Sequence, residues 1–411
     1  MVKVKTIFFG MYFLLLWSRI YVIAGMYHLP IDSSLIQVCY VGAILLIEML
    51  SKKNKISKKI GGMEVAILLL IVYWILFSFV FVNPVMARYT KGVTLRQGLF
   101  LAVAIATALF VKKHRIIGEW INISFLTIAL VLVVQFAMNI SELAYINVGA
   151  IFNVSIRSRV NFGLGHYNYL GMLCASEIVL GIWLIKSCEG IKRYFVYGIC
   201  ALAVIMLLGS ASRNAIFSLI VFALVEAYLN LNNHPLRKLY KLLIKILIVV
   251  TILVMILWNN GTLTVENLLL DSNRMTLFSA ALPTFMNSGR TWIGLGLASG
   301  EIYGENLTPY KTYWLDNGYI YTLVTSGYLG AIIYIVVIVL FLWKFVKLRK
   351  KNEPIGNFLL GTFWMYLFGA LFETTLFNGG VLHNYFWVPI FLIGTSDYFE
   401  RDGRDKFETR K

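Results

Sequence analysis

Twelve apolar stretches divide this chain of 411 residues, and the links between them alternate between lysine-rich and lysine-poor. Each stretch is long enough, or nearly so, to cross a bilayer core, which needs about 20 helical residues. Backbone groups inside a bilayer have no water to bond, so each stretch is expected to be an α-helix. The expected spans are residues 6–25, 33–50, 61–82, 93–111, 118–140, 167–186, 194–210, 212–231, 240–258, 314–343, 356–374 and 381–399. The chain is therefore predicted to be an all-α, polytopic integral membrane protein with a single transmembrane domain over residues 1–411.

Composition agrees with a membrane protein, because 59% of the residues are apolar, 14% are charged and the mean hydropathy is +0.76. A β-barrel would instead show alternating segments of about ten residues. The net charge of +17 does not indicate nucleic-acid binding, because 27 of the 37 lysines and arginines lie in every second link or at the termini. This is the pattern of the positive-inside rule. It places both termini in the cytoplasm and the lysine-poor links outside.

The first span and the cysteines argue against a cleaved signal peptide and against disulfide bonds. Arg19 lies within the first span and no small-residue cleavage site follows it, so the span is predicted to be retained and not cleaved as a signal peptide. The cysteines lie in or at the edge of spans, where no oxidised pair is expected: Cys39, Cys174, Cys188 and Cys200. No disulfide, metal site or cofactor is predicted.

Two lysine-poor links are long, residues 141–166 and 259–313, and they hold most of the polar residues that the topology does not explain. The longer link is predicted to contain a helix that begins at Asp271, presents Met275, Phe278, Leu282 and Phe285 on one face, and ends at Asn287-Ser288-Gly289. We expect it to form one large extracytoplasmic loop whose helix lies on the membrane surface. A surface flap without a functional role is the alternative.

Arginines on the lysine-poor side indicate an anionic ligand. Arg213 lies in the hairpin Gly209-Ser210-Ala211-Ser212-Arg213-Asn214, where two spans meet with almost no loop, so its guanidinium is expected near headgroup depth. A phospholipid headgroup is an ordinary partner there. A diphosphate is the alternative, because the guanidinium fork suits a pair of phosphate oxygens. Arg157, Arg159 and Arg290 lie on the same side.

Few groups on this side are able to act as a base. They are Asp316, His166, and His383 with Glu373 around the last outer turn. Asp316 is expected to open a helix of about 30 residues, where the helix dipole favours a carboxylate whatever its function. Glu373 and Glu177 are expected some distance inside their spans, where they are either proton-relay groups or neutral, hydrogen-bonded acids.

At these residues the chain resembles the bacterial polysaccharide polymerases and O-antigen ligases, the Wzy-type and WaaL-type membrane glycosyltransferases. Three stretches carry the resemblance: Ser210-Ala211-Ser212-Arg213-Asn214; Asn273-Arg274-Met275 through Gly289-Arg290-Thr291-Trp292-Ile293-Gly294-Leu295-Gly296; and Asp316-Asn317-Gly318-Tyr319 through Gly327-Tyr328-Leu329-Gly330. The ligases place a histidine where Asp316 stands, which favours the polymerase branch.

The resemblance implies a GT-C-like helical fold and metal-independent sugar transfer on the outer face of the bacterial cytoplasmic membrane. The implied donor is a growing glycan on undecaprenyl diphosphate, and the acceptor is an incoming lipid-linked repeat unit. The resemblance also implies contact with membrane lipid, and it implies a flippase and a chain-length regulator as protein partners.

The hypothesis assigns roles to named residues. Arg213 and Arg290 hold the donor diphosphate, helped by Arg157 or Arg159, and Asp316 accepts the proton of the acceptor hydroxyl, with His166 as the competing base. Supporting positions are Arg274, Asn317, Asn168, Glu373 and His383. A ligase that moves finished glycan onto a wall or lipid acceptor stays open as an alternative. So does a lipid-linked oligosaccharide flippase, although its polar residues would line a central path.

Overall fold

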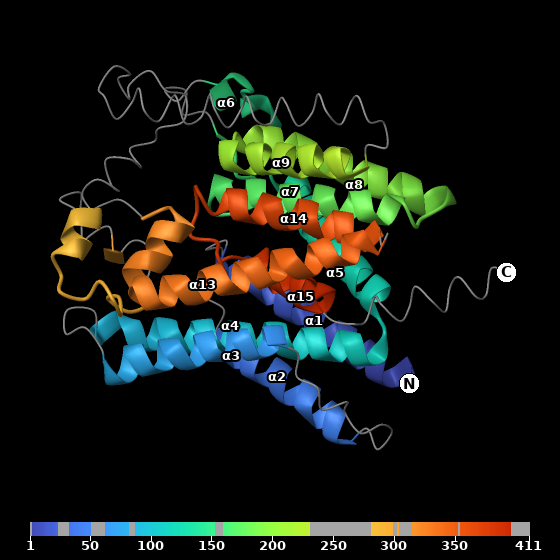
Figure 1. Cartoon of the computed structure of the whole chain (residues 1–411). Coiled ribbons are helices and arrows are strands. Elements are labelled where there is room, and N and C mark those ends of the chain that lie inside the picture. Colours follow the sequence, from blue (N-terminus) through green and yellow to red (C-terminus); the bar gives the residue numbers. More distant parts are fainter. Residues whose placement is uncertain are drawn as a thin grey trace.

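A computed structural model describes residues 2–23, 33–50, 62–81, 87–152, 159–230, 281–298, 302–303, 315–351 and 354–395. Within these ranges the chain is helical and has no strand (Figure 1). The main helices are α1 (Val2–Ile23), α2 (Ser33–Leu50), α3 (Gly62–Ile75), α4 (Ala87–His114), α5 (Ile117–Met138), α7 (Tyr167–Ile185), α8 (Gly190–Ser210), α9 (Arg213–Asn230), α13 (Gly318–Lys350), α14 (Pro354–Gly369) and α15 (Asn384–Gly394). Shorter elements are the π-helix Leu76–Val80, the 3-10 helix Ile140–Tyr145 and α6 (Gly149–Phe152).

These helices occupy eleven of the twelve predicted spans, and the span predicted at 240–258 lies outside the described residues. Six described helices are long and apolar enough to cross a membrane: α4, α5, α7, α8, α9 and α13. Large apolar side chains point outward from several helices, such as Leu14 (61% exposed), Leu46 (59%) and Ile335 (59%). Such a surface is stable against lipid and not against water. The chain is therefore a membrane-embedded, multi-helix protein.

The core of the bundle surrounds α15, of which every residue is buried. This helix packs against α4, α13 and α14, and aromatic rings fill the space between them. Phe363 and Phe391 meet edge to face with ring centroids 5.0 Å apart, and Trp387 stacks on Phe391. Aromatic pairs of this kind stabilise a core beyond the area that they bury.

One end of the bundle, on the right in Figure 1, is called here the lysine-rich end. It gathers the ends of helices that flank the lysine-rich links. Polar contacts at this end join Lys5 to Glu119 (3.4 Å), Lys113 and His114 to Glu48, Lys186 to Glu226 (3.0 Å) and Asn357 to Asn230 (2.9 Å). These pairs join α1 to α5, α2 to α4, α7 to α9, and α9 to α14. Neighbouring described helices therefore meet at this end, and the described parts of the lysine-poor links, such as the α8–α9 turn, lie at the opposite end.

Helix α13 differs from the prediction in two ways. Its N-cap is Asn317 and not Asp316: the Asn317 side chain accepts hydrogen bonds from the backbone N–H groups of Tyr319 (3.0 Å) and Ile320 (2.9 Å). Asp316 thus precedes the cap. The helix is also broken at Gly327, whose backbone has φ 64° and ψ −170°. The apolar sequence on both sides of Gly327 predicted one continuous helix. The break is possible at this position because glycine adopts such a conformation without strain.

Part of the large predicted loop folds onto the first piece of α13. Residues 281–286 are helical and the helix ends at residues 287–289, where Gly289 has φ +68°, which confirms the predicted end. A separate small core forms from Ala281, Phe285, Leu295, Ala298, Tyr303, Leu315 and Val324. Burial raises the pKa of the Tyr303 hydroxyl, so it stays protonated and donates to the Gly296 carbonyl. The predicted start of the helix, with Asp271, Met275 and Phe278, lies outside the described residues.

Candidate functional site

Asn168 joins three separate parts of the chain at the end opposite the lysine-rich end. It lies in the first turn of α7, where His166 is the N-cap and its Nδ1 accepts from the Asn168 backbone N–H (3.2 Å). The Asn168 amide Nδ2 donates to Glu373 Oε1 (2.7 Å), and its Oδ1 accepts from the Ser212 hydroxyl (3.3 Å). The start of α7, the α8–α9 hairpin and the chain after α14 therefore meet at one side chain.

The α8–α9 hairpin places Arg213 beside this meeting point. Ala211 turns the chain with a left-handed φ of 45°, and Arg213 is the first residue of α9, half-buried. The turn lies tightly against α7, because a side chain at Gly171 would collide with Ser212. The predicted hairpin is confirmed, and its position next to Asn168 follows from this close approach.

Arg159 reaches the same region from the link before α7. Its guanidinium lies over the Tyr167 ring, 4.5 Å from the ring centre, and the next residue, Val160, donates its N–H to the Gly209 carbonyl of the hairpin (3.0 Å). The stacking holds the cation near the start of α7. Arg157 and Arg274, also predicted for the site, lie outside the described residues.

The start of α13 completes the group. Asn317 Nδ2 donates to the Leu371 carbonyl (2.8 Å), and the Gly318 N–H donates to the Ala370 carbonyl (2.7 Å). These bonds hold the segment that carries Asp316 against the turn that carries Glu373. Glu373 lies in the turn after α14 and not inside a span, which corrects the sequence expectation: the helix ends at Gly369.

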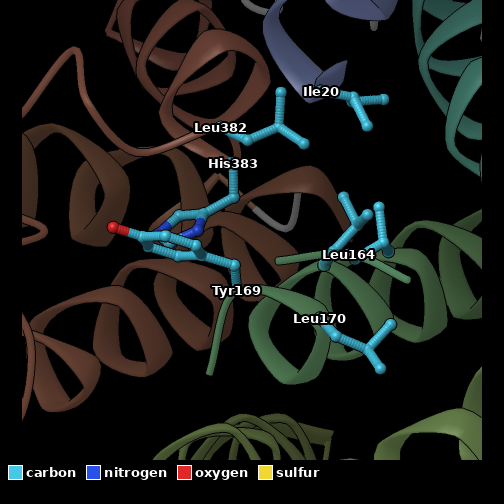
Figure 2. A pocket seen from close by; sticks show the side chains of 7 residues that line it. Ile20, Leu164, Tyr169, Leu170, Leu382 and His383 are labelled. Carbon is cyan, nitrogen blue, oxygen red and sulfur yellow. The ribbon is translucent and has the colours of Figure 1, made fainter. Parts of the chain in front are cut away.

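His383 lies deeper, directly before α15. It is 4% exposed, and within the described part of the chain its Nε2 atom is buried without a hydrogen-bond partner. Figure 2 shows it beside Tyr169 on the wall of a small, mostly apolar cavity that Ile20, Leu164, Leu170, Leu173 and Leu382 also line. His383 therefore faces the interior side of the site.

Arg290 belongs to a different set of contacts. Its guanidinium donates to the Phe81 carbonyl at the end of the π-helix that follows α3 (2.6 Å). The segment after it, residues 291–296, pairs with the break in α13 through backbone bonds: Leu295 N to Val324 O, Gly296 N to Thr325 O, Tyr328 N to Thr291 O and Leu329 N to Trp292 O. The second and third stretches of the resemblance are thus joined directly. A shared diphosphate site for Arg213 and Arg290 stays a prediction.

The group around Asn168 combines carboxylates and an imidazole with two arginines. Asp316, Glu373 and His166 are candidate bases, and Arg213 and Arg159 are candidate partners for phosphate oxygens. Sequence reasoning selected charged and amide side chains and assigned no role to the Tyr169 and Ser212 hydroxyls. Their signal was a polar side chain at the start of an apolar helix.

No known protein family model matches this chain, and no curated protein matches it.

Proposed function

We propose that this chain is a membrane glycosyltransferase that polymerises undecaprenyl-diphosphate-linked repeat units on the outer face of the bacterial cytoplasmic membrane. In this proposal it has about 12 spans, a GT-C-like arrangement and both termini in the cytoplasm. The observation that carries it is the junction at Asn168, which bonds His166, Ser212 and Glu373 at the end of the bundle opposite the lysine-rich end. Arg213 follows Ser212 directly, and Asp316 precedes Asn317, which bonds the same turn as Glu373.

The proposed reaction is a displacement at the anomeric carbon of the growing glycan. A hydroxyl at the non-reducing end of the incoming unit forms the new C–O bond, the bond to the diphosphate breaks, and undecaprenyl diphosphate leaves. Asp316 takes the hydroxyl proton, with His166 as the competing base. Arg213 stabilises the departing diphosphate with Arg159 or Arg157, and Arg290 is assigned to the same diphosphate on the resemblance alone.

The packing of the bundle centre favours this proposal over a flippase. Aromatic side chains fill the space around α15, whereas the candidate polar groups gather at one end. A translocation path for a charged, sugar-bearing headgroup needs polar side chains along its length. A ligase would use the same residues, so the acceptor decides between ligase and polymerase.

The test is a reaction of purified protein with lipid-linked repeat units from its own host, followed by a gel that resolves chain length. We expect a ladder from the wild type and its loss in Arg213→Ala and Asp316→Ala. Arg96→Ala, an exposed arginine of α4, is the matched control and should keep the ladder. Arg213→Lys should lose most activity, because an ammonium does not bind two oxygens side by side.

Two outcomes would contradict the proposal. Unextended substrate with folded wild-type protein would exclude polymerisation of these units and favour a flippase or a ligase. A full ladder from Asp316→Ala would exclude that carboxylate as the base, and His166→Ala would then be compared.

A further inference from the structure

Arg19 is a buried cation that the proposed reaction does not use. It lies on α1, is 6% exposed, and donates from its guanidinium to the Gly379 carbonyl (2.9 Å). The guanidinium also lies over the Tyr385 ring, 5.1 Å from its centre. A charged group inside an apolar bundle is costly and is retained with specific partners. Here those partners belong to α15 and to the segment that precedes it.

Gln97 on α4 holds the same segment from another side. Its Nε2 donates to the Phe377 carbonyl and its Oε1 accepts from the Gly379 N–H (2.8 Å). The side chain is 7% exposed, so both ends of the amide make their bonds inside the protein. The contact is close, because a Cβ atom at Gly379 would lie 2.6 Å from the Phe100 Cβ.

The segment held in this way is the α14–α15 loop, residues 370–383, which carries both Glu373 and His383. Hydrogen bonds within the loop connect the held stretch to Glu373. Asn378 Nδ2 donates to the Thr374 carbonyl (2.8 Å), and the Thr375 N–H donates to the Glu373 carbonyl (2.8 Å). Tyr366 adds a further support, because its hydroxyl donates to Thr375 O and accepts from Phe377 N.

We propose that Arg19 and Gln97 are positioning residues that fix the α14–α15 loop so that the Glu373 carboxylate meets Asn168. The loop has no continuous helix, so its own backbone does not determine where Glu373 points. Two side chains from α1 and α4 hold one short stretch, Phe377 to Gly379, and the loop bonds extend that order to Glu373. The importance of Glu373 for catalysis rests on the proposed function, but the clamp itself does not.

A crosslinking experiment tests the clamp without any activity assay. Asn168→Cys and Glu373→Cys are introduced into a chain whose four native cysteines are replaced by alanine, and a short bis-methanethiosulfonate joins the pair. The rate of crosslinking in this double-cysteine chain is compared with the rate in the same chain after Gln97→Met or Arg19→Met. Thr107→Val is the matched control, since it removes a buried polar group of α4 that bonds Tyr40 and not the loop.

We expect crosslinking to slow about tenfold in Gln97→Met and Arg19→Met, because a loop that is no longer held lowers the effective concentration of one thiol at the other. The control should keep the original rate. Arg19→Lys retains the charge and a donor for the Gly379 carbonyl, so it should give an intermediate rate. This variant distinguishes a loss of positioning from a failure to fold. Equal rates in all variants with a single size-exclusion peak would overturn the inference.

The activity arm separates this proposal from the proposed function. In a chain that keeps Asn168 and Glu373, Gln97→Met should lower kcat with little change in KM. The substrate contacts are kept, and only the Glu373 carboxylate is misplaced. If the wild type makes no glycan ladder while the crosslinking rates still differ, the clamp stands and the function fails. If KM rises with kcat unchanged, the positioning role is wrong.

Discussion

Asn168 uses both atoms of its amide to connect elements that are far apart in the sequence. Its donor bonds the Glu373 carboxylate and its acceptor takes the Ser212 hydroxyl, while its backbone N–H bonds His166. Aspartate has the same shape without the donor, and leucine has neither polar atom. The site therefore depends on the amide and not only on the size of this side chain.

We expect Asn168→Leu to lower the free energy of unfolding by about 1.5–3 kcal/mol, the usual contribution of a hydrogen bond to a charged group. Asn168→Asp should be worse at neutral pH, because it sets two carboxylates side by side, and acidification should restore part of the loss by protonating one of them. Melting temperatures in detergent measure both effects. Asn287→Ala, an exposed asparagine, is the control, and an equal shift there would contradict the role of the amide.

At the scale of elements, the backbone groups at the break in α13 bond to a segment some thirty residues earlier in the chain. Gly327 has a left-handed φ of 64°, and Gly294, opposite it, has φ +80°. A side chain on either glycine would enter the backbone of the other segment. The break leaves the Val324 and Thr325 carbonyls without the next helical turn, and they accept bonds from the N–H groups of Leu295 and Gly296 instead.

Gly327→Ala should detach the segment 291–296 from α13. The left-handed conformation alone costs a residue with a side chain about 1–2 kcal/mol, and the collision with Trp292 adds to it. Cleavage by trypsin after Arg290 should then become roughly tenfold faster, because local opening exposes the site. Gly198→Ala is the control, since nothing lies within 4 Å of its added Cβ. Unchanged cleavage would mean that the backbone pairing is not what holds the segment.

At the scale of the whole molecule, the two ends of the bundle differ in kind. One end carries lysine–glutamate pairs between neighbouring helices. The other carries the group around Asn168 and the small core of the large loop. This polarity is what the alternating links require if the bundle crosses a membrane.

The two ends should be accessible from opposite sides of the membrane. In a chain without native cysteines, Ala144→Cys, exposed in the link before α7, should react with a membrane-impermeant maleimide on intact cells or spheroplasts. Glu189→Cys, exposed between α7 and α8, should react only after permeabilisation. Labelling of both positions from outside, or the reverse order, would show that the orientation is wrong.

Apolar length and turn residues predicted the helices well, because burial in lipid leaves the backbone no alternative to a helix. The sequence also located the α8–α9 hairpin and the end of the loop helix at residues 287–289. It misplaced the start of α13, since Asp316 and Asn317 are both good caps, and the bond from Asn317 to the Leu371 carbonyl in the α14–α15 loop favours Asn317. It missed the break at Gly327 and the burial of His383, because distant segments create both.

The pairing of residues 291–296 with α13 is made by main-chain atoms, and this has a consequence for how the protein is able to change. Side chains at Thr291, Trp292 and Ile293 contribute no atom to those bonds, so substitutions there leave the attachment in place. Gly294 and Gly296 alone are tied to their positive φ values. Natural variation is thus free to alter the outward chemistry of this segment, where Trp292 is 63% exposed, without rebuilding the scaffold beneath it.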